Sequence, residues 1–164
     1  SYEGRGLHPY ILYNPDMPVL ARNKRATFDY EILERIEAGI VLTGQEVKSA
    51  KTGHAKLQGA FVNIRNGEAW IKNLFIAPYS HAGQLDHYEP SQNRRLLIHR
   101  REIVALEKKL DGERLTIVPI SLYTKAGNIK VELGLARGKR QFEKRNAIRG
   151  RELDRDARRL MGKS

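Results

Sequence analysis

The spacing of apolar and polar residues changes several times along the chain, and each change marks a new element. Between residues 29 and 43 apolar side chains fall on even positions and charged ones mainly on odd positions. The even-numbered apolar set is Tyr30, Ile32, Ile36, Ala38, Ile40 and Leu42. A period of two over this length predicts one long, half-buried strand, with Leu33 and Glu34 as exceptions and a bend at Gly39.

Two short helices are predicted on either side of the middle of the chain. Thr43 and Glu46 have the spacing of a capping box, in which each side chain binds a backbone N–H of the first turn. Gly53 suits the left-handed position that ends a helix. A second helix is predicted in the latter half of residues 94–112, where the apolar stripe and the stop signal are Ile103, Leu106, Leu110 and Gly112.

Two hairpins are predicted from their turn residues. Residues 60–76 contain Asn66-Gly67, the dipeptide that a two-residue type I′ turn favours. Residues 115–135 read as a second hairpin, with a turn at 126–128 followed by strict alternation. Pro119 has no backbone N–H to donate, so we expect it at a sheet edge or at a bulge.

These elements predict a mainly β fold with short helices, made of five or six antiparallel strands and two helices. We expect residues 21–136 to form a closed antiparallel β-barrel of the oligonucleotide-binding (OB-like) type, because closure removes exposed strand edges. Residues 1–20 contain three prolines and are predicted to be a flexible N-terminal arm. Residues 137–164 have only a sparse apolar stripe, so this C-terminal tail is predicted to be disordered alone and helical against a partner.

The charge of the chain indicates a polyanionic partner. The 164 residues carry a net charge of +11, and residues 137–164 hold 11 Lys and Arg against 4 Asp and Glu. A basic total with a basic tail is typical of proteins that bind nucleic acid or an anionic membrane. No apolar run approaches the ~20 residues of a membrane span. No secretory segment is visible, and a chain that opens on Ser1 is expected to be processed or truncated. We therefore expect a cytoplasmic protein with no membrane partner.

No catalytic centre, metal site or cofactor is predicted. The chain has no cysteine, which excludes disulfides and thiolate ligands, and its five histidines include no pair four residues apart. Nucleophile elbows and glycine-rich phosphate loops are missing as well. Four aromatic residues fall on predicted strands, and most of them are expected in the core: Phe61, Trp70, Phe75 and Tyr123. Residue chemistry alone therefore predicts a basic β-barrel, without enzyme activity, that binds structured RNA.

Particular blocks of sequence resemble those of a known family. Residues 23–26, 37–44 and 46–49 are similar to the opening blocks of small protein B, the SsrA-binding protein family. Further similar blocks follow in the family's order, at 95–99, 118–119, 122–123, 130–133, 135–139, 143–145 and 148–152. The resemblance runs from about Ala21 to the end of the chain.

The resemblance implies a function in ribosome rescue. Proteins of this family bind the tRNA-like domain of transfer-messenger RNA (SsrA RNA) and deliver it to stalled ribosomes for trans-translation. The protein stands in for the anticodon arm, and its tail enters the decoding centre and the empty mRNA channel as a helix. The implied partners are transfer-messenger RNA, the small ribosomal subunit with its 16S rRNA, and elongation factor Tu, with the protein itself a monomer.

The resemblance also implies two sets of functional residues. The RNA-binding set is Asn23, Lys24, Arg25, Glu37, Lys48, Leu97, His99, Arg137 and Lys139. The ribosome-directed set is Phe142, Glu143, Lys144, Arg145, Arg149, Arg151, Arg155, Arg158, Arg159, Leu160 and Met161, with Phe142 expected to stack on a base. Two alternatives stay open, because Glu37 could be a buried structural residue and Leu97 a core residue. Rival classes are a general ribosomal-RNA-binding translation protein and an RNA-modifying enzyme.

Overall fold

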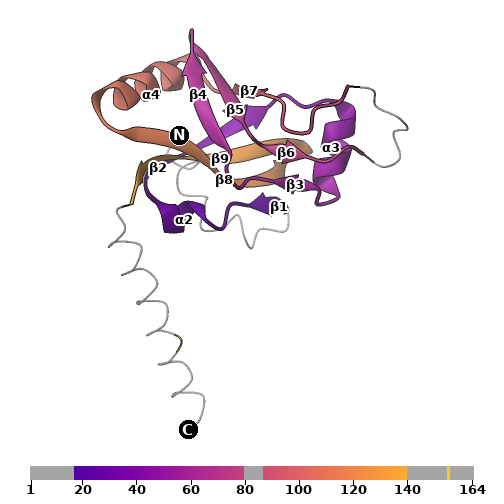
Figure 1. Cartoon of the computed structure of the whole chain (residues 1–164). Helices are drawn as coiled ribbons and strands as arrows, with labels where there is room; N and C mark the ends of the chain where they lie inside the picture. Colours follow the sequence, from indigo (N-terminus) through magenta and orange to yellow (C-terminus); the bar gives the residue numbers. More distant parts are fainter. Residues whose placement is uncertain (1–16, 80–86, 140–154, 156–164) are drawn as a thin grey trace.

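The computed structural model describes residues 17–79, 87–139 and 155, and in these ranges the fold is mainly β with short helices (Figure 1). The strands are β1 (Val19–Arg22), β2 (Tyr30–Ile40), β3 (Ala55–Lys56), β4 (Phe61–Arg65), β5 (Glu68–Lys72), β6 (Phe75–Ile76), β7 (Arg94–Leu97), β8 (Leu115–Lys125) and β9 (Asn128–Gly138). The helices are α2 (Ala26–Asp29), α3 (Gly44–Lys51) and α4 (Arg100–Gly112). The described residues hold more strands than predicted, because the short β1, β3 and β6 carry no periodic signal of their own.

The predicted start and end of helix α3 are confirmed. The Thr43 hydroxyl accepts a hydrogen bond from the backbone N–H of Glu46 at 3.2 Å, and the Glu46 carboxylate accepts one from the Thr43 N–H at 3.0 Å. Gly53 follows the helix with a φ of +86°, a value that glycine adopts without strain. Local side-chain chemistry therefore sets both ends of α3.

Both predicted hairpins are present. Asn66 and Gly67 have φ values of 53° and 74° and join β4 to β5 in the type I′ manner. The turn between β8 and β9 consists of Ala126 and Gly127 alone, because Asn128 already pairs with Lys125. The predicted turn at 126–128 was therefore one residue too long.

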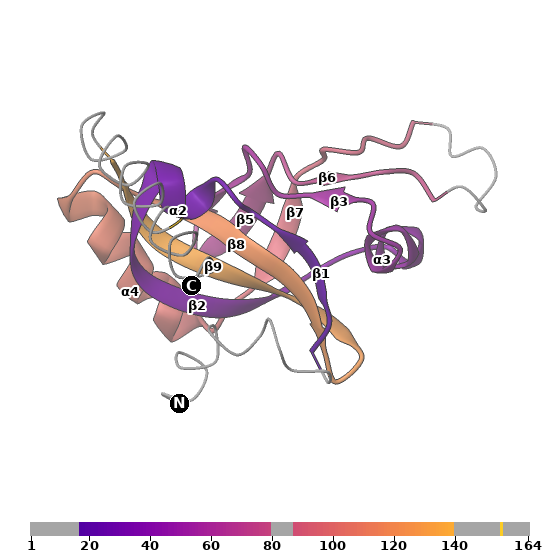
Figure 2. The same cartoon turned by 90° about the horizontal axis from the view of Figure 1, so that it is seen from below.

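The strand pairings, all antiparallel, return to their starting point. Seven strands join in the order β1-β8-β4-β5-β7-β2-β9, and β9 also pairs with β8. Strands β8, β4, β5, β7, β2 and β9 thus form a circuit, while β1 and β4 share one edge of β8. Figure 2 shows β1, β8, β9 and β2 curving side by side. Pro119 lies at a register shift in the β8–β9 pairing, which confirms the predicted bulge.

Strand β2 changes faces near its start. Its register with β9 shifts between Ile32 and Glu34, which leaves Leu33 as an extra residue, 43% exposed. Ile36 therefore packs against the main core, whereas Ile32 packs outside the circuit. The outer cluster consists of Ala26, Val118 and Ala136, with Tyr30 and Ile32 against it. The prediction of one apolar face along the whole strand is wrong for this reason.

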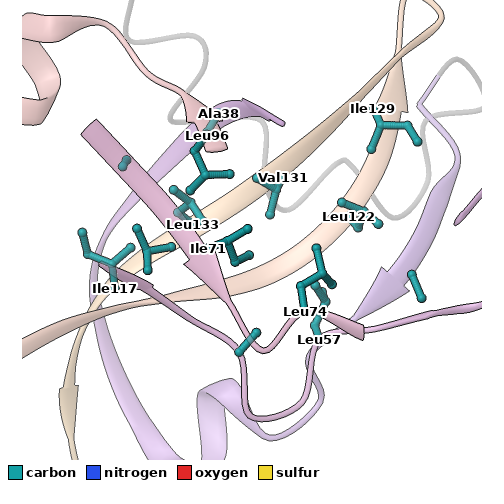
Figure 3. Packing of buried hydrophobic residues seen from close by; sticks show 14 of the residues in the cluster. Ala38, Leu57, Ile71, Leu74, Leu96, Ile117, Leu122, Ile129, Val131 and Leu133 are labelled. Atoms are coloured by element: carbon teal, nitrogen blue, oxygen red, sulfur yellow. The ribbon is translucent and has the colours of Figure 1, made fainter. Parts of the chain in front are cut away.

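The main core lies inside the circuit of strands, as Figure 3 shows. Its fully buried members include Ile71, Leu74, Ile76, Ile117, Leu122, Val131 and Leu133. Helix α4 adds Leu106 to this cluster, and its Ile103 is also buried, as the apolar stripe predicted. Full burial of each such side chain contributes about 1.5–3 kcal/mol. No helix among the described residues is long and apolar enough to cross a membrane.

Candidate RNA interface

Asn23, the first of the predicted RNA-binding residues, binds strand β8 at its bulge. The side-chain amide of Asn23 donates to the carbonyl oxygen of Pro119 at 3.0 Å, and its backbone N–H donates to that of Ile120 at 2.8 Å. Lys24 and Arg25 follow directly and are exposed. Asn23 therefore anchors the connection from β1 to α2, and this anchor presents two cations to solvent.

The end of strand β9 comes back to the same place. The Lys139 ammonium group donates to the carbonyl oxygen of Thr27 at 2.8 Å, and the Lys139 N–H donates to that of Asp29 at 2.9 Å. Arg25 lies 4.6 Å from the centre of the Phe28 ring. The predicted residues Lys24, Arg25 and Lys139 thus gather around helix α2. We call this group the α2 end.

Arg137 has two carboxylate neighbours, whereas Arg25 of the α2 end has one, Asp29 at 3.4 Å. The Arg137 guanidinium group lies 3.6 Å from Glu31 and 3.6 Å from Glu113. These last three side chains are more than half exposed, so each pair contributes little to stability. A ligand phosphate would compete with both carboxylates for this arginine.

Glu37 lies farther along β2, on the face of the strand that points away from the main core. Its carboxylate accepts a hydrogen bond from the Tyr123 hydroxyl, and Lys125 approaches its two oxygens at 3.2 and 3.4 Å. Burial, followed by the hydrogen bond to Glu37, raises the pKa of Tyr123, so the tyrosine stays a proton donor. Glu37 is therefore only partly structural, because its carboxyl group is also partly exposed.

A row of paired residues crosses four strands beside Glu37. Tyr123 pairs with Lys130, Lys130 with Gly39, and Gly39 with Leu97, from β8 through β9 and β2 to β7. Adjacent positions in such a row are about 5 Å apart. A Cβ atom on Gly39 would lie 3.2 Å from the Leu97 Cβ, so the glycine makes room for the leucine. Leu97 is 57% exposed, which contradicts the alternative that it belongs to the core.

A groove of about 1000 Å³ opens next to this row, between β2, β7 and helix α4. Glu37, Leu97 and His99 line it, together with Arg35, Arg95 and Lys130. His99 is exposed and precedes α4, and its carbonyl oxygen accepts from the Ile103 N–H at 3.0 Å. The structure therefore brings three predicted residues together in one place, which we call the β2–α4 groove.

Lys48 does not join either group. It is exposed on helix α3, where its ammonium group lies 5.7 Å from the centre of the Tyr79 ring. Figures 1 and 2 both place α3 at the end of the molecule away from α2 and α4. Lys48 thus lies apart from the other predicted RNA-binding residues.

Sequence reasoning missed several residues of the groove and its surroundings. Lys130, Tyr123 and Lys125 reach the Glu37 neighbourhood only through strand pairing, which no local pattern encodes. Arg35 lies two residues before Glu37, and its guanidinium group is 3.1 Å from the buried Glu132. Its odd position in the alternating strand was the one available signal for it.

The aromatic residues are less buried than predicted. Tyr123 is fully buried, but Trp70 and Phe75 are only partly buried and Phe61 is 38% exposed. Trp70 pairs with Asn63 and Arg95 on the outer face of β5, so its ring lies opposite the core. The expectation that most of these rings belong to the core is wrong.

A second polar cluster, which the sequence did not reveal, lies beneath helix α3. Arg94 and Glu46 are both 2% exposed, and Arg94 Nε donates to the Glu46 carboxylate at 2.7 Å. The other donors to Glu46 are Thr43, Tyr88 and Gln92. The remaining guanidinium contacts are the carbonyl oxygens of Leu74, Pro90 and Gln92 and the hydroxyl oxygen of Tyr88. All donor and acceptor groups of this pair are therefore occupied, as a buried charge requires.

The electrostatics of this cluster follow from the same contacts. Burial alone would raise the pKa of Glu46, but hydrogen bonds from the Thr43 backbone, Arg94 and Gln92 outweigh it and lower the pKa below 4.5. Burial and the Glu46 charge raise the pKa of Tyr88. Glu46 is thus held ionised and Tyr88 neutral.

The ribosome-directed residues fall almost entirely outside the described residues. Arg155 is described, as helical and exposed. The others outside are Phe142, Glu143, Lys144, Arg145, Arg149, Arg151, Arg158, Arg159, Leu160 and Met161. Among the described residues no three His, Asp or Glu side chains are placed to hold a metal ion.

Known proteins similar to this chain agree in family. A family model described as "SmpB protein" matches residues 20–163. The SsrA-binding protein of Synechococcus sp. (strain JA-3-3Ab) is 48% identical over 146 residues, which are 89% of this chain and 95% of that protein. The SsrA-binding protein of Streptococcus uberis (strain ATCC BAA-854 / 0140J) is 46% identical over 143 residues, which are 87% and 92% of the two chains.

A solved structure is also similar. It is described as "tmRNA-SmpB: a journey to the center of the bacterial ribosome", and it matches with a TM-score of 0.63 and 44% sequence identity. The match covers 80% of this chain and 95% of that chain. The family match covers most of the chain, and the matched residues include both the α2 end and the β2–α4 groove. The chain therefore belongs to the SmpB protein family.

Proposed function

We propose that this protein binds the tRNA-like domain of transfer-messenger RNA and delivers it to stalled ribosomes for trans-translation. The observation that carries the proposal is the family match over residues 20–163, together with relatives named SsrA-binding proteins at 46–49% identity. The similar solved structure is described by the words tmRNA and ribosome.

The α2 end and the β2–α4 groove together form the RNA-binding surface in this proposal. Lys24, Arg25 and Lys139 supply phosphate contacts, which position an RNA without reading its sequence. Leu97 supplies an exposed apolar contact beside Gly39. Glu37 repels phosphate, so its contribution is to accept hydrogen bonds from base or ribose groups.

The body of the protein is in this proposal an OB-like barrel. The circuit of six antiparallel strands supports this assignment, since a closed circuit leaves β1 as the added strand at one edge. Barrels of this kind bind oligonucleotides on their outer strand faces. The groove beside β2 and β7 is such an outer position.

The tail is in this proposal the ribosome-directed part. Phe142 stacks on a base of the decoding centre, a contact worth about 1–3 kcal/mol in single-strand binders. The tail arginines pair with 16S rRNA phosphates along the mRNA channel, and Leu160 and Met161 pack near its far end. The ordering entropy of roughly 1 kcal/mol per residue is offset only by these contacts, so the helix forms on the ribosome.

The remaining parts of the proposal concern the cellular setting. The protein acts as a cytoplasmic monomer, without enzyme activity, and shares transfer-messenger RNA with elongation factor Tu. Sedimentation of the protein with transfer-messenger RNA and elongation factor Tu tests the monomer state and the shared binding. One copy of each component in the complex is the expected result, and two copies of the protein would contradict the monomer.

A binding comparison tests the main proposal. We expect the full chain to bind an isolated tRNA-like domain at least about 10-fold more tightly than an ordinary transfer RNA, a difference of 1.4 kcal/mol. Equal affinity for the two RNAs, or tight binding to ribosomal RNA alone, would support the general translation protein instead.

A truncation tests the function of the tail. A chain that ends at Lys139 keeps the hydrogen bond from Lys139 to Asp29, so the body stays complete. We expect this chain to bind the tRNA-like domain within about threefold of the full chain, a difference under 1 kcal/mol. It should fail to support tagging on a stalled ribosome. Near-normal tagging would contradict the ribosome-directed assignment.

A further inference from the structure

Tyr123 is fully buried although it points away from the main core. It is 1% exposed, and the residues that pack on it are Met17 and Val19. Val19 pairs with Tyr123 across β1 and β8, and the Pro18 carbonyl oxygen accepts from the Thr124 N–H at 3.0 Å. Met17 to Val19 therefore cover the outer face of β8 at this residue. They precede residue 20, where the match to the family model begins.

The hydroxyl group of the buried Tyr123 contacts Glu37. The hydroxyl donates to Oε2 of Glu37, and Lys125 approaches both carboxylate oxygens. Tyr123 and Lys125 both come from β8, whereas the carboxylate belongs to β2, with β9 between the two strands. The side chain of Glu37 is 27% exposed, so donors from the protein hold part of the carboxylate and the rest faces solvent at the groove.

A carboxylate in an RNA interface needs such support. It repels phosphate groups, and the partners it can bind are N–H groups on base edges and ribose 2′-hydroxyls. A free glutamate side chain adopts many rotamers and loses that freedom when RNA binds. Donors that fix the carboxylate beforehand remove this loss and so strengthen binding.

We propose that Tyr123, covered by Met17 to Val19, is a positioning residue that holds the Glu37 carboxylate ready to accept hydrogen bonds from bound RNA. The inference rests on the proposed function, because it takes the tRNA-like domain as the ligand. It also gives the segment at the start of β1 a function, namely to keep water from the Tyr123–Glu37 hydrogen bond.

A purely structural function for Tyr123 makes a different prediction, and the chain offers a matched control. Tyr88 also places its hydroxyl beside a glutamate, and its single proton is shared between Oε2 of Glu46 at 3.2 Å and the carbonyl oxygen of Ile76 at 2.8 Å. Glu46 belongs to helix α3, which lies at the other end of the molecule from helix α4 (Figure 2), and neither Tyr88 nor Glu46 lines the groove. Tyr88→Phe and Tyr123→Phe therefore remove the same chemical group from the two sites, and only the second should change RNA binding.

The test is a double-mutant cycle in the full chain, with the isolated tRNA-like domain as the RNA. We expect Tyr123→Phe to weaken binding by about 3- to 10-fold, the effect of one hydrogen bond. On a Glu37→Ala background the same change should have no further effect, within about twofold, because Tyr123 acts through Glu37. Tyr88→Phe should leave affinity within about twofold of the unaltered chain.

A second variant removes the cover and leaves the hydroxyl in place. Met17→Ala exposes one edge of the Tyr123 ring, and it should weaken binding in the same direction while adding nothing to Glu37→Ala. Urea unfolding of each variant separates lost affinity from lost stability. This arm keeps the test decisive even where Tyr123→Phe lowers the folded fraction.

Three results would overturn the inference: unchanged affinity in Tyr123→Phe, independent losses in the cycle, or equal losses for Tyr88→Phe and Tyr123→Phe. Each of these assumes that the unaltered chain prefers the tRNA-like domain over an ordinary transfer RNA. If the unaltered chain shows no such preference, the proposed function fails. The affinity of the unaltered chain for the two RNAs therefore separates a failure of the proposed function from a failure of this inference.

Discussion

Two glutamates of this protein have similar partners and different surroundings. Glu46 and Glu37 each accept a hydrogen bond from a tyrosine and each face a basic side chain. The carboxylate of Glu46 is 2% exposed and has four donors around it, whereas Glu37 has two donors and a side chain that is 27% exposed. The first carboxylate is saturated and the second is not.

The difference teaches how the surroundings of a carboxylate indicate its function. The remaining donors of Arg94 bind backbone carbonyl oxygens and the Tyr88 hydroxyl, so the Glu46 cluster joins helix α3 to strand β7 and has no group left for a ligand. Lys125 is a partly exposed point charge beside Glu37 and leaves the groove side of the carboxylate open. We therefore assign Glu46 to the fold and propose Glu37 as an RNA-binding residue.

Breaking the saturated cluster should have the largest effect. Arg94→Met leaves the Glu46 carboxylate buried without its counter-charge, so the free energy of unfolding should fall by about 3–5 kcal/mol. Urea denaturation measures this. Arg95→Met is the matched control, because Arg95 is 52% exposed and lies 3.9 Å from Glu68, and its loss should cost under about 0.5 kcal/mol.

Removing charge from the α2 end should lower affinity next most strongly. Replacing Lys24 and Arg25 by Ala should reduce the log–log slope of affinity against salt by up to about two contacts, near 0.7 to 0.9 each. Titrations at several salt concentrations measure the slope. Neutralising Glu37 should leave the slope nearly unchanged. If replacing Lys24 and Arg25 also left the slope unchanged, the α2 end would not belong to the RNA-binding surface.

A smaller effect is expected from filling the space beside Leu97. Gly39→Ala places a Cβ atom 3.2 Å from the Leu97 Cβ, so the leucine must shift. We expect RNA binding to weaken by about 1 kcal/mol, the lower end of overpacking effects. Ala substitution at Gly44, where a Cβ meets nothing within 4 Å, is the control. Equal affinity for both variants would mean that Leu97 has no fixed place in the interface.

The smallest effect concerns pH. Because the folded chain lowers the pKa of Glu46, the stability it contributes is present above the ordinary value of 4.5 and is lost as pH falls through the lower folded pKa. The free energy of unfolding of the unaltered chain should therefore decline more steeply below that pH than that of Glu46→Gln. Parallel slopes for the two chains would contradict the lowered pKa.

The sequence predicted those parts of the fold that depend on local chemistry. Thr43 and Glu46 set a cap through side-chain hydrogen bonds, whereas Asn66-Gly67 and Pro119 set a turn and a bulge through backbone preferences. The alternation broke at Leu33 and Glu34, but the sequence could not show that Leu33 is an extra residue, because a bulge appears only in the register of two paired strands. One inserted residue moves Ile32 to the outer face.

The candidate interface was predictable in part for a related reason. The family blocks pointed to Glu37, Leu97 and His99, and all three line the groove. Lys130 and Tyr123 join them only through pairing of strands far apart in sequence. Arg94 and Arg95 look alike in sequence, yet alternation along β7 buries the first and exposes the second. Such distinctions need the completed sheet.

One paired measurement tests the contrast between the two glutamates most directly: the affinity for the tRNA-like domain and the free energy of unfolding, for Glu37→Gln and Glu46→Gln. Glu46→Gln should cost about 3 kcal/mol or more of stability and leave the affinity of the folded chain within about twofold. Glu37→Gln should cost under about 1 kcal/mol, since the amide oxygen still accepts from Tyr123, and should weaken RNA binding by about 3- to 10-fold.

The sign of the Glu37→Gln effect decides between contact and simple repulsion. A glutamate that touches no RNA group only repels phosphate, so its neutralisation would tighten binding. Weaker binding is the predicted result. Tighter or unchanged binding would contradict the assignment of Glu37 to the RNA interface.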